Sequence, residues 1–276
     1  MKPPEPHFFA QELRPGLFLI SAPEWEQPTS TVNCWLVVGK EQALLVDAGL
    51  PCTGLRAFAE LTAEHPVRLV LTHGHFDHAG ALAEFDTFSM NPADESLLHG
   101  GAGLPATKYN GTLLPLRPGD TVELGSRTLL VYGVQGHTKG SLVLLDTATH
   151  TLLSGDSVAR RGLFPTPREL PLVRYFDDLL RLESLDFDGV ASAHDRFLLP
   201  KNQIRYFICG MLRGIQNPDG EWELPSGESF VSIHAGDGVE DPDYLSISLP
   251  QADLPLVRQE LCDWQKDHPD FESLIY

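Results

Sequence analysis

The segment Thr72 to His78 places three imidazoles and one carboxylate within seven residues, directly after the apolar run Val67 to Leu71. Successive side chains of an extended chain alternate between two faces, so His73, His75 and Asp77 can point the same way. Three histidines beside an aspartate would repel one another if charged and would be costly if buried unpaired, unless a cation organises them. The segment therefore predicts a metal site at the end of a strand.

The ligand types in this segment also indicate which metals would suit it. Imidazole and carboxylate fit zinc and its first-row neighbours, so we expect zinc first, with iron and manganese also compatible. His78 follows Asp77 into an expected helix over residues 77–85, whose N-terminus Asp77 could cap in addition to binding a metal. A lone histidine on a strand would more often be structural, and the density of this cluster is what favours a metal.

Length, composition and net charge limit the classes of protein to which this chain can belong. The chain has 276 residues, of which 42% are hydrophobic, enough for one large core or two modest ones. Residues 1–9 contain no continuous apolar stretch, and no segment is long enough to span a bilayer, so we expect a cytoplasmic protein with no membrane partner. A formal net charge of −18 argues against nucleic-acid binding, which normally rests on a basic face. The expected partner is a small-molecule substrate, and the sequence leaves the oligomeric state open.

The cysteines predict neither a zinc finger nor a disulfide scaffold, because they show no CxxC spacing. They stand far apart, at Cys34, Cys52, Cys209 and Cys262.

Short apolar strands alternate with turns and helices in two β-rich halves. In the first half we expect strands over 16–21, 32–38, 42–47, 67–71 and 87–90, a helix over 53–64 and a helix opening at 91–92. In the second half we expect strands over 128–134, 141–145, 151–153 and 189–193 and a helix over 175–185. After residue 200 we expect a helix over 203–212, strands near Phe230 and Tyr244, and a final helix over 254–267. This order predicts an α/β fold of paired sheets with helices outside.

Three further candidate ligands stand where strands of the second half end. His137, Asp156 and His194 each follow an apolar run and are flanked by small residues. Strand ends at one edge of a sheet are where α/β architectures collect functional groups. Each residue alone would more often be structural, but with the first cluster they give five histidines and two aspartates.

These residues resemble, in their order along the chain, the ligand set of the metallo-β-lactamase-fold superfamily. The hallmark His-x-His-x-Asp-His motif is matched by residues 73–78, and a Gly-His-Thr histidine, a Gly-Asp aspartate and a late histidine are matched by His137, Asp156 and His194. Asp47 matches the aspartate that ends an earlier strand in the family. The resemblance spans about residues 15–200 and implies an αβ/βα four-layer sandwich with a two-metal cleft at one edge of the sheets.

The resemblance also implies a division of the chain and of the ligands. Residues 1–200 would form a metallo-β-lactamase-like catalytic domain, and residues 201–276 would either close the same domain or form a small accessory cap. The first metal would be held by His73, His75 and His137, the second by Asp77, His78 and His194, with Asp156 bridging. Such a pair lowers the pKa of a bound water from ~15.7 toward ~7. Asp77 would either accept a proton from that nucleophile or act solely as a ligand.

Further residues are candidates for supporting roles. Metal-bound imidazoles usually donate their second N–H to a carboxylate or carbonyl, which makes Asp47 and Asp195 candidate partners, although Asp195 could instead cap the next turn. Lys139 and Ser141 either reach the cleft or serve a turn. We expect His7, His65, His150 and His268 to face solvent. His99 and His234 either face the cleft or are structural. Arg160, Arg161 and Phe164 stand on a loop that either lines the pocket or is solvated.

The resemblance narrows the function. True β-lactamases of the superfamily carry cysteine or serine where Asp156 stands, and the flavodiiron branch carries glutamate where His75 stands. The match is closer to glyoxalase II-like thioesterases, lactonases and related phosphodiesterases. The chain departs from glyoxalase II at Ser141, where that family has a histidine, and after Lys201, where no glutathione-binding region is matched.

We therefore expect a dinuclear-metal hydrolase that uses a metal-bridging hydroxide to cleave a small ester, thioester or lactone. One alternative is phosphodiester or phosphonate hydrolysis at the same centre, favoured if Arg160 or Arg161 enters the pocket. The other alternative is a metal-stabilised binding or sensor module without turnover.

Overall fold

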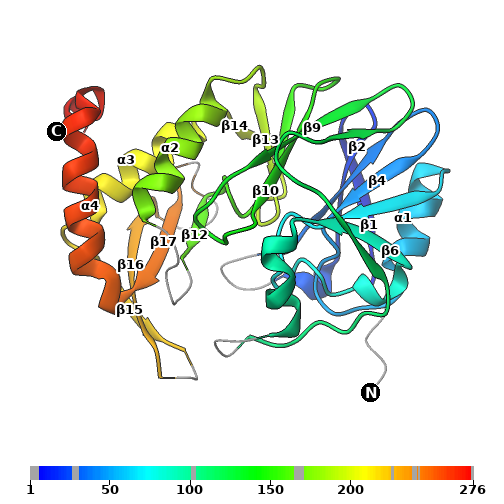
Figure 1. Ribbon diagram of the computed structural model, residues 1–276, viewed down its shortest axis with the longest axis horizontal. Helices are drawn as coiled ribbons and strands as arrows, with labels where there is room; N and C mark the ends of the chain where they lie inside the picture. Colours follow the sequence, from blue (N-terminus) through cyan, green and yellow to red (C-terminus); the bar gives the residue numbers. More distant parts are fainter. Residues whose placement is uncertain are drawn as a thin grey trace.

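The computed structural model describes residues 6–26, 31–100, 104–164, 171–224, 227–237, 241 and 243–274. Two sheets stack face to face, a third sheet adjoins them, and helices cover the outer sides (Figure 1). In this view α1 lies toward one end of the molecule and α4 lies at the other. Among the residues described, no helix is both long enough and apolar enough to cross a bilayer.

The first sheet has seven strands that follow the order of the chain. They are β1 (Phe9–Arg14), β2 (Leu17–Ser21), β3 (Cys34–Val38), β4 (Ala43–Val46), β5 (Val67–Val70), β6 (Thr87–Met90) and β7 (Thr112–Pro115). Strands β1 to β4 form an antiparallel meander, whereas β4 to β7 run parallel. The carboxyl ends of β4, β5 and β6 therefore lie at the same edge of the sheet.

The second sheet has six strands in the order β14-β13-β11-β10-β9-β8. They are β8 (Thr121–Glu123), β9 (Thr128–Gly133), β10 (Leu142–Asp146), β11 (Thr151–Gly155), β13 (Gly189–Ser192) and β14 (Leu199–Pro200). Only the pair β11 and β13 runs parallel in this sheet. These two strands end just before Asp156 and His194.

The third sheet combines one strand from before residue 200 with three strands from after it. It consists of β12 (Arg161–Leu163), β17 (Leu245–Pro250), β16 (Ser229–Ala235) and β15 (Gly220–Glu223), in that spatial order. Strand β12 pairs in parallel with β17, so the segment that follows Asp156 is hydrogen-bonded to strands of the last 60 or so residues. Its remaining pairs are antiparallel.

The helices cover two outer faces. On the first sheet lies α1 (Leu55–Ala63), and over the second and third sheets lie α2 (Leu172–Glu183), α3 (Gln203–Gly214) and α4 (Leu254–Asp267). Short 3₁₀-helices are η1 (Pro23–Trp25), η2 (Leu82–Glu84), η3 (Pro92–His99), η4 (Gln251–Asp253) and η5 (Pro269–Leu274). The ring of Trp264 on α4 packs 5.2 Å from that of Phe176 on α2, centroid to centroid.

Alternating side chains explain why these layers form. On β3, Trp35 and Val37 pack between the two sheets, while Cys34 and Leu36 pack against α1. On β10, Leu142 and Leu144 pack between the sheets, whereas Val143 faces the α2 side. Strands with two apolar faces must be covered on both sides, which requires helix, sheet, sheet and helix in sequence. The predicted αβ/βα sandwich is confirmed.

The helix predicted over 77–85 is wrong. Its backbone groups pair instead with the loop after β4, because Ala48 N–H donates to the His78 carbonyl and Ala81 N–H donates to the Ala48 carbonyl, at 2.7 and 3.0 Å. Gly80 packs so closely on this loop that a Cβ would lie 2.1 Å from the carbonyl carbon of Leu50. The chain forms turns followed by the short η2, and Asp77 caps no helix.

Candidate metal centre

The loops that carry the histidines meet where the two stacked sheets are joined by backbone hydrogen bonds. Leu142 N–H on β10 donates to the Thr72 carbonyl after β5, at 2.8 Å. Gly155, at the end of β11, has a φ of +52°, and a Cβ there would lie 2.3 Å from Thr72 Oγ1. The two sheets therefore approach closely enough at this edge for side chains from both to share one site.

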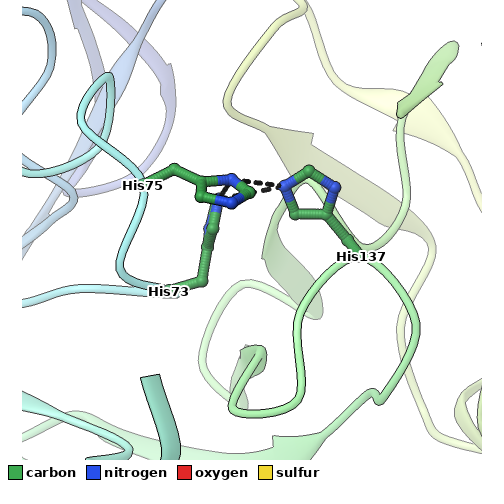
Figure 2. A group of neighbouring side chains, drawn as sticks. All are labelled: His73, His75 and His137. Atoms are coloured by element: carbon green, nitrogen blue, oxygen red, sulfur yellow. Dashed lines mark hydrogen bonds between the residues drawn. The ribbon is translucent and has the colours of Figure 1, made fainter. Parts of the chain in front are cut away.

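Three histidines form the first group. His73 Nε2 lies 3.0 Å from His75 Nδ1, and His137 Nε2 lies 3.1 Å from His73 Nε2 and 2.9 Å from His75 Nδ1. Figure 2 shows His73 and His75 on one loop and His137 on another, with their rings pointing toward one another. All three side chains are buried.

The second group contains carboxylates. Asp156 Oδ1 lies 3.2 Å from His78 Nε2 and 3.1 Å from His194 Nε2. Asp77 Oδ2 lies 3.9 Å from each of the same two nitrogens. Asp156 also reaches the first group, because its Oδ2 lies 3.4 Å from His137 Nε2. The structure thus brings all seven predicted ligand residues together, with Asp156 between the two groups.

Hydrogen bonds from the outer ring nitrogens fix which nitrogen faces the centre. His137 Nδ1 lies 2.6 Å from the Leu163 carbonyl, and His194 Nδ1 lies 2.6 Å from the Thr31 carbonyl. A carbonyl only accepts, so each Nδ1 carries a hydrogen and, in the neutral ring, each Nε2 presents a lone pair inward. The same holds for His78, whose Nδ1 lies 2.9 Å from Asp47 Oδ2.

The inward atoms fit a metal ion better than they fit one another. His78 Nε2 and Asp156 Oδ1 are both buried and neither has a hydrogen bond of acceptable geometry among the described residues, although they lie only 3.2 Å apart. In the first group three ring nitrogens lie within 3.1 Å of one another. Lone pairs so close are stabilised when a cation accepts all of them. The donor set therefore fits divalent metal binding.

Without a cation, the two groups differ in proton affinity. Burial lowers the pKa of His73 well below its usual value, and burial together with His137 lowers that of His75 to about 3. In the second group burial is again the largest single cause and lowers the pKa, but the neighbouring carboxylates, Asp156 foremost, together outweigh it, which raises the pKa of His194 to about 9 and that of His78 well above its usual value. Burial opposes ionisation of Asp156, yet His194 and His78 hold the pKa of this carboxyl well below its usual range.

Asp47 occupies the supporting position expected for it. Besides His78, its carboxylate accepts from the Thr72 N–H at 2.8 Å and from Thr72 Oγ1 at 2.9 Å. Its backbone has a φ of 68°, a left-handed conformation that is unusual for a non-glycine residue. Thr72 in turn contacts His73, with Oγ1 and Nδ1 3.1 Å apart. One buried aspartate therefore orients histidines of both groups, directly or through Thr72.

Asp195 does not contact a ligand imidazole, contrary to the expectation for a supporting carboxylate. Its Oδ1 accepts from Arg160 Nε at 2.7 Å, and its Oδ2 accepts from Ser192 Oγ at 2.7 Å. The outer nitrogen of His194 is already taken by the Thr31 carbonyl, which leaves Asp195 to pair with a buried arginine. Asp195 thus anchors the loop that carries His194.

Asp94 is a supporting residue that the sequence analysis missed. This buried carboxylate on η3 accepts from Thr138 Oγ1 and from the Gly140 N–H, both at 2.6 Å, and burial raises its pKa. Ser141 Oγ completes the turn by accepting from the Thr138 N–H at 3.2 Å. Ser141 therefore serves the turn that follows His137. No sequence signal links Asp94 to His137, because they stand 43 positions apart in the chain.

A cavity of about 440 Å³ opens beside the cluster. Its wall includes the ligand residues His75, Asp77, His137, Asp156 and His194, and many residues of the third sheet. Arg161 and His234 line it, as the sequence allowed, whereas Arg160 is buried against Asp195, Phe164 packs in the core and His99 stacks on Tyr109.

The histidines expected in solvent lie away from the cavity. His7 and His150 are exposed, and His65 and His268 are partly buried. Lys139, which was expected to reach the cleft or serve a turn, is exposed and does not line the cavity.

Comparison with protein families and curated proteins gives a consistent result. A family model described as metallo-beta-lactamase superfamily matches residues 28–199. An acyl-coenzyme A thioesterase, MBLAC2, from Gallus gallus is 30% identical over 183 residues, which cover 55% of this chain and 66% of that protein. A hydroxyacylglutathione hydrolase from Edwardsiella ictaluri is 28% identical, over 61% of this chain and 67% of that protein. The chain spans just under two thirds of the length of the thioesterases that it matches.

Solved structures share the fold. A metallo-beta-lactamase from Pontibacter korlensis superposes with a TM-score of 0.60 at 18% identity, over 72% of this chain and 96% of that chain. A metallo-beta-lactamase family protein from Thermus thermophilus gives a TM-score of 0.57 at 22% identity, over 86% of this chain and 99% of that chain. At these identities the similarity establishes the sandwich architecture alone.

Proposed function

Because the chain belongs to the metallo-beta-lactamase superfamily, we propose that it is a metal-dependent hydrolase that cleaves a small ester, thioester or lactone in the cavity beside the histidine cluster. The observation that carries this proposal is the convergence of ligand-type atoms from two groups on the shared carboxylate of Asp156. A buried cluster of this kind that opens into a cavity is suited to chemistry on a bound molecule.

We assign the ligands in two sets that share Asp156. The first cation would be held by His73, His75 and His137, and the second by Asp77, His78 and His194. Two divalent ions bound there, zinc first with iron or manganese as alternatives, would supply Lewis acidity and make hydroxide available near neutral pH. The convergence of inward lone pairs supports this assignment.

Asp77 is the residue that we assign to proton transfer. Its side chain lines the cavity, is about 22% exposed, and is farther from the inward nitrogens than the carboxylate of Asp156 is. A carboxylate in that position can accept at Oδ2 a proton from water that enters the cavity and can deliver it to the leaving group. Asp47, by contrast, is buried behind His78 and orients that ring.

Thioesters are the preferred substrates of the three classes. The similarity to acyl-coenzyme A thioesterases and to a hydroxyacylglutathione hydrolase supports this choice. β-Lactams are disfavoured, since true β-lactamases resemble this ligand set but carry cysteine or serine at the position of Asp156. We further propose that residues 201–276 close the catalytic domain, because strands of this segment form one wall of the cavity.

Elemental analysis combined with a substrate panel tests the proposal. Protein purified and reconstituted with zinc, iron or manganese should bind about two ions per chain, as this ligand set implies, and should hydrolyse at least one thioester, ester or lactone. Chelation should abolish turnover, and restoring the metal should recover it. A metal-replete, folded protein that turns over none of a broad panel would refute the proposed hydrolase.

Phosphodiester hydrolysis is a second candidate, favoured by the position of Arg161 in the cavity wall. An arginine there could bind a phosphate oxygen. Comparing bis-p-nitrophenyl phosphate with S-butyryl-pantetheine at equal concentration decides between the two. Faster turnover of the phosphodiester would replace the thioester proposal.

A further inference from the structure

The third sheet presents one face to the cavity and the other to the core. On β17, Leu245, Ile247 and Leu249 are buried in the core beside α3 and α4, while Ser246 and Ser248 line the cavity. On β16 the same alternation buries Val231 and Ile233 in the core, whereas residues 230, 232 and 234 line the cavity. A sheet with one apolar and one polar face normally turns its polar face to water. Here that face forms a wall opposite the metal ligands.

Strand register arranges the wall in rows. Arg161 pairs with Ser246, and Ser246 pairs with His234, so these three residues form one row across β12, β17 and β16. We call it the anion row. Neighbours in adjacent strands that share a face stand close enough for their side chains to bind one ligand. All three residues line the cavity.

Arg161 differs from three arginines that form ion pairs with carboxylates. Its neighbour Arg160 pairs with Asp195, Arg127 pairs with Asp146, and Arg205 pairs with Glu183. In the described part of the chain Arg161 has neither an ion pair nor a side-chain hydrogen bond. Arginine stays charged at all physiological pH values, and the chain holds 38 acidic residues against 20 basic ones. An unpaired guanidinium in a cavity wall of such an acidic protein is therefore available to a ligand.

His234 is held in place beside it. Its Nδ1 lies 2.9 Å from Asp219 Oδ1, and its backbone N–H donates to the same oxygen at 3.1 Å. This leaves Nε2 as the remaining polar atom of the ring.

The opposite end of the wall has a different character. Trp222 stacks on Phe230 with ring centroids 4.5 Å apart, and Trp222 Nε1 donates to the hydroxyls of Ser232 and Ser248. These two hydroxyls form the next row of the wall and lie 2.7 Å from each other, so they hydrogen-bond to each other. Glu228 is the acidic lining residue at this end, beyond the aromatic pair, in the turn between β15 and β16. A ligand that lies along the wall therefore meets a cation at one end and an aromatic surface at the other.

We propose that the anion row binds a carboxylate or phosphate of the substrate, remote from the scissile bond, with Arg161 as the main contact. This inference rests on the proposed hydrolase and names its substrate class: thioesters or esters that carry an oxyanion group on one arm and an apolar group on the other. Arginine is suited to this role because its planar fork donates two hydrogen bonds to either group.

A matched set of thioesters tests the inference. S-butyryl-pantetheine is neutral, S-succinyl-pantetheine adds a carboxylate at the end of the acyl arm, and S-butyryl-4′-phosphopantetheine adds a phosphate at the end of the thiol arm. The wild type should show a kcat/KM at least about tenfold higher for one of the charged substrates than for the neutral one. Which one is preferred identifies the source of the anion.

The variant Arg161→Ala should remove that preference. KM for the preferred anionic substrate should rise about 10- to 100-fold, while kcat and the neutral substrate remain nearly unchanged. Arg161→Lys should recover part of the loss, because it restores the charge without the fork. The control Arg174→Ala removes the same charge from an exposed position on α2 and should leave the preference intact.

A binding measurement separates this inference from the proposed hydrolase. The non-hydrolysable thioethers S-butyl-pantetheine, S-(3-carboxypropyl)-pantetheine and S-butyl-4′-phosphopantetheine are titrated by calorimetry into wild type and Arg161→Ala. Tighter binding of a charged thioether by the wild type alone supports the anion row even if no thioester is hydrolysed. Hydrolysis of all three thioesters at similar kcat/KM, or an equal loss for neutral and charged substrates in Arg161→Ala, overturns the anion row and leaves the hydrolase standing.

Discussion

Both halves of the histidine cluster contain imidazoles, but these imidazoles lie in different surroundings. His73, His75 and His137 pack mainly against one another, and burial keeps the first two neutral. His78 and His194 lie against Asp156, which together with the other nearby carboxylates outweighs burial and favours their protonated forms. His73 and His75 can therefore accept a cation without releasing protons, whereas His78 and His194 must exchange protons for a cation. Filling of the two sites should differ in order and in pH dependence.

The largest expected effect comes from Asp156→Asn, which removes the charge that joins the two groups. The variant should keep at most one tightly bound cation, and kcat should fall by about 10³-fold or more, because metal Lewis acidity contributes several kcal/mol to such reactions. Metal content per chain and initial rates measure this outcome. The control Asp186→Asn changes an exposed carboxylate and should alter neither. Two retained ions with near-normal turnover would show that the groups act independently.

A smaller effect is expected from Asp47→Asn, which weakens the hydrogen bonds to His78 and Thr72. Supporting carboxylates of this kind change metal affinity by about 10- to 100-fold. Competition with a chromophoric chelator measures the affinity of each site. Asp195→Asn is the matched control, since its carboxylate contacts Arg160 and Ser192 and should affect stability more than metal affinity. Equal losses in both variants would contradict an orienting role for Asp47.

The pH dependence of metal binding should separate the two groups directly. Below about pH 9 the second site must displace the proton of His194, which alone should lower its metal affinity about tenfold for each unit of pH, and displacing the proton of His78 should make the fall steeper. At the first site His73 and His75 should release no proton down to mildly acidic pH, because burial lowers the pKa of both and that of His75 reaches about 3. Calorimetric titrations in buffers of different ionisation enthalpy count the protons released. Identical proton release at both sites would contradict the contrast.

The same contrast should appear in the way the free energy of unfolding of the metal-free protein depends on pH. His194 binds its proton more tightly in the folded than in the unfolded chain, so it stabilises the fold fully below pH 6.5 and loses that contribution as the pH rises through about 9. His75, with its lowered pKa, acts in the opposite direction. Its neutral form is favoured by folding above pH 6.5, and this contribution is lost as the pH falls toward 3.

The smallest effect is expected from Ser141→Ala, which removes a hydroxyl from the turn behind His137. The free energy of unfolding should fall by about 1 kcal/mol, with metal content unchanged, because the Leu163 carbonyl still holds the ring. Denaturant unfolding of the metal-loaded protein measures it. Loss of one cation from Ser141→Ala would show that the turn is needed for the first site.

Much of the fold could be predicted from hydrophobic periodicity. The final helix over 254–267 and the strands that end before Asp156 and His194 follow directly from the apolar runs. The expected helix over 77–85 failed because its backbone pairs with the loop at Ala48, a contact between residues about 30 apart. Local pattern carries no information on such contacts.

That the candidate ligand residues lie together could be predicted, because they stand at strand ends next to small residues, a position that the sequence marks. The wall of the cavity could not be predicted from the sequence. Ser246 and Ser248 alternate with buried leucine and isoleucine, which predicts a sheet with one polar face, but nothing in that alternation tells what the polar face meets. Likewise Thr31 and Leu163 hold histidines through main-chain carbonyls, which have no side-chain signature.

Those two carbonyls have a consequence for how the centre tolerates genetic change. No substitution deletes a main-chain oxygen, so the orientations of His137 and His194 withstand drift at positions 163 and 31. The orientations of His78 and His73 rest instead on the side chains of Asp47 and Thr72, where a single codon change removes the acceptor. Mutational tolerance across this centre is therefore uneven, and each half contains a robust ring and a vulnerable ring.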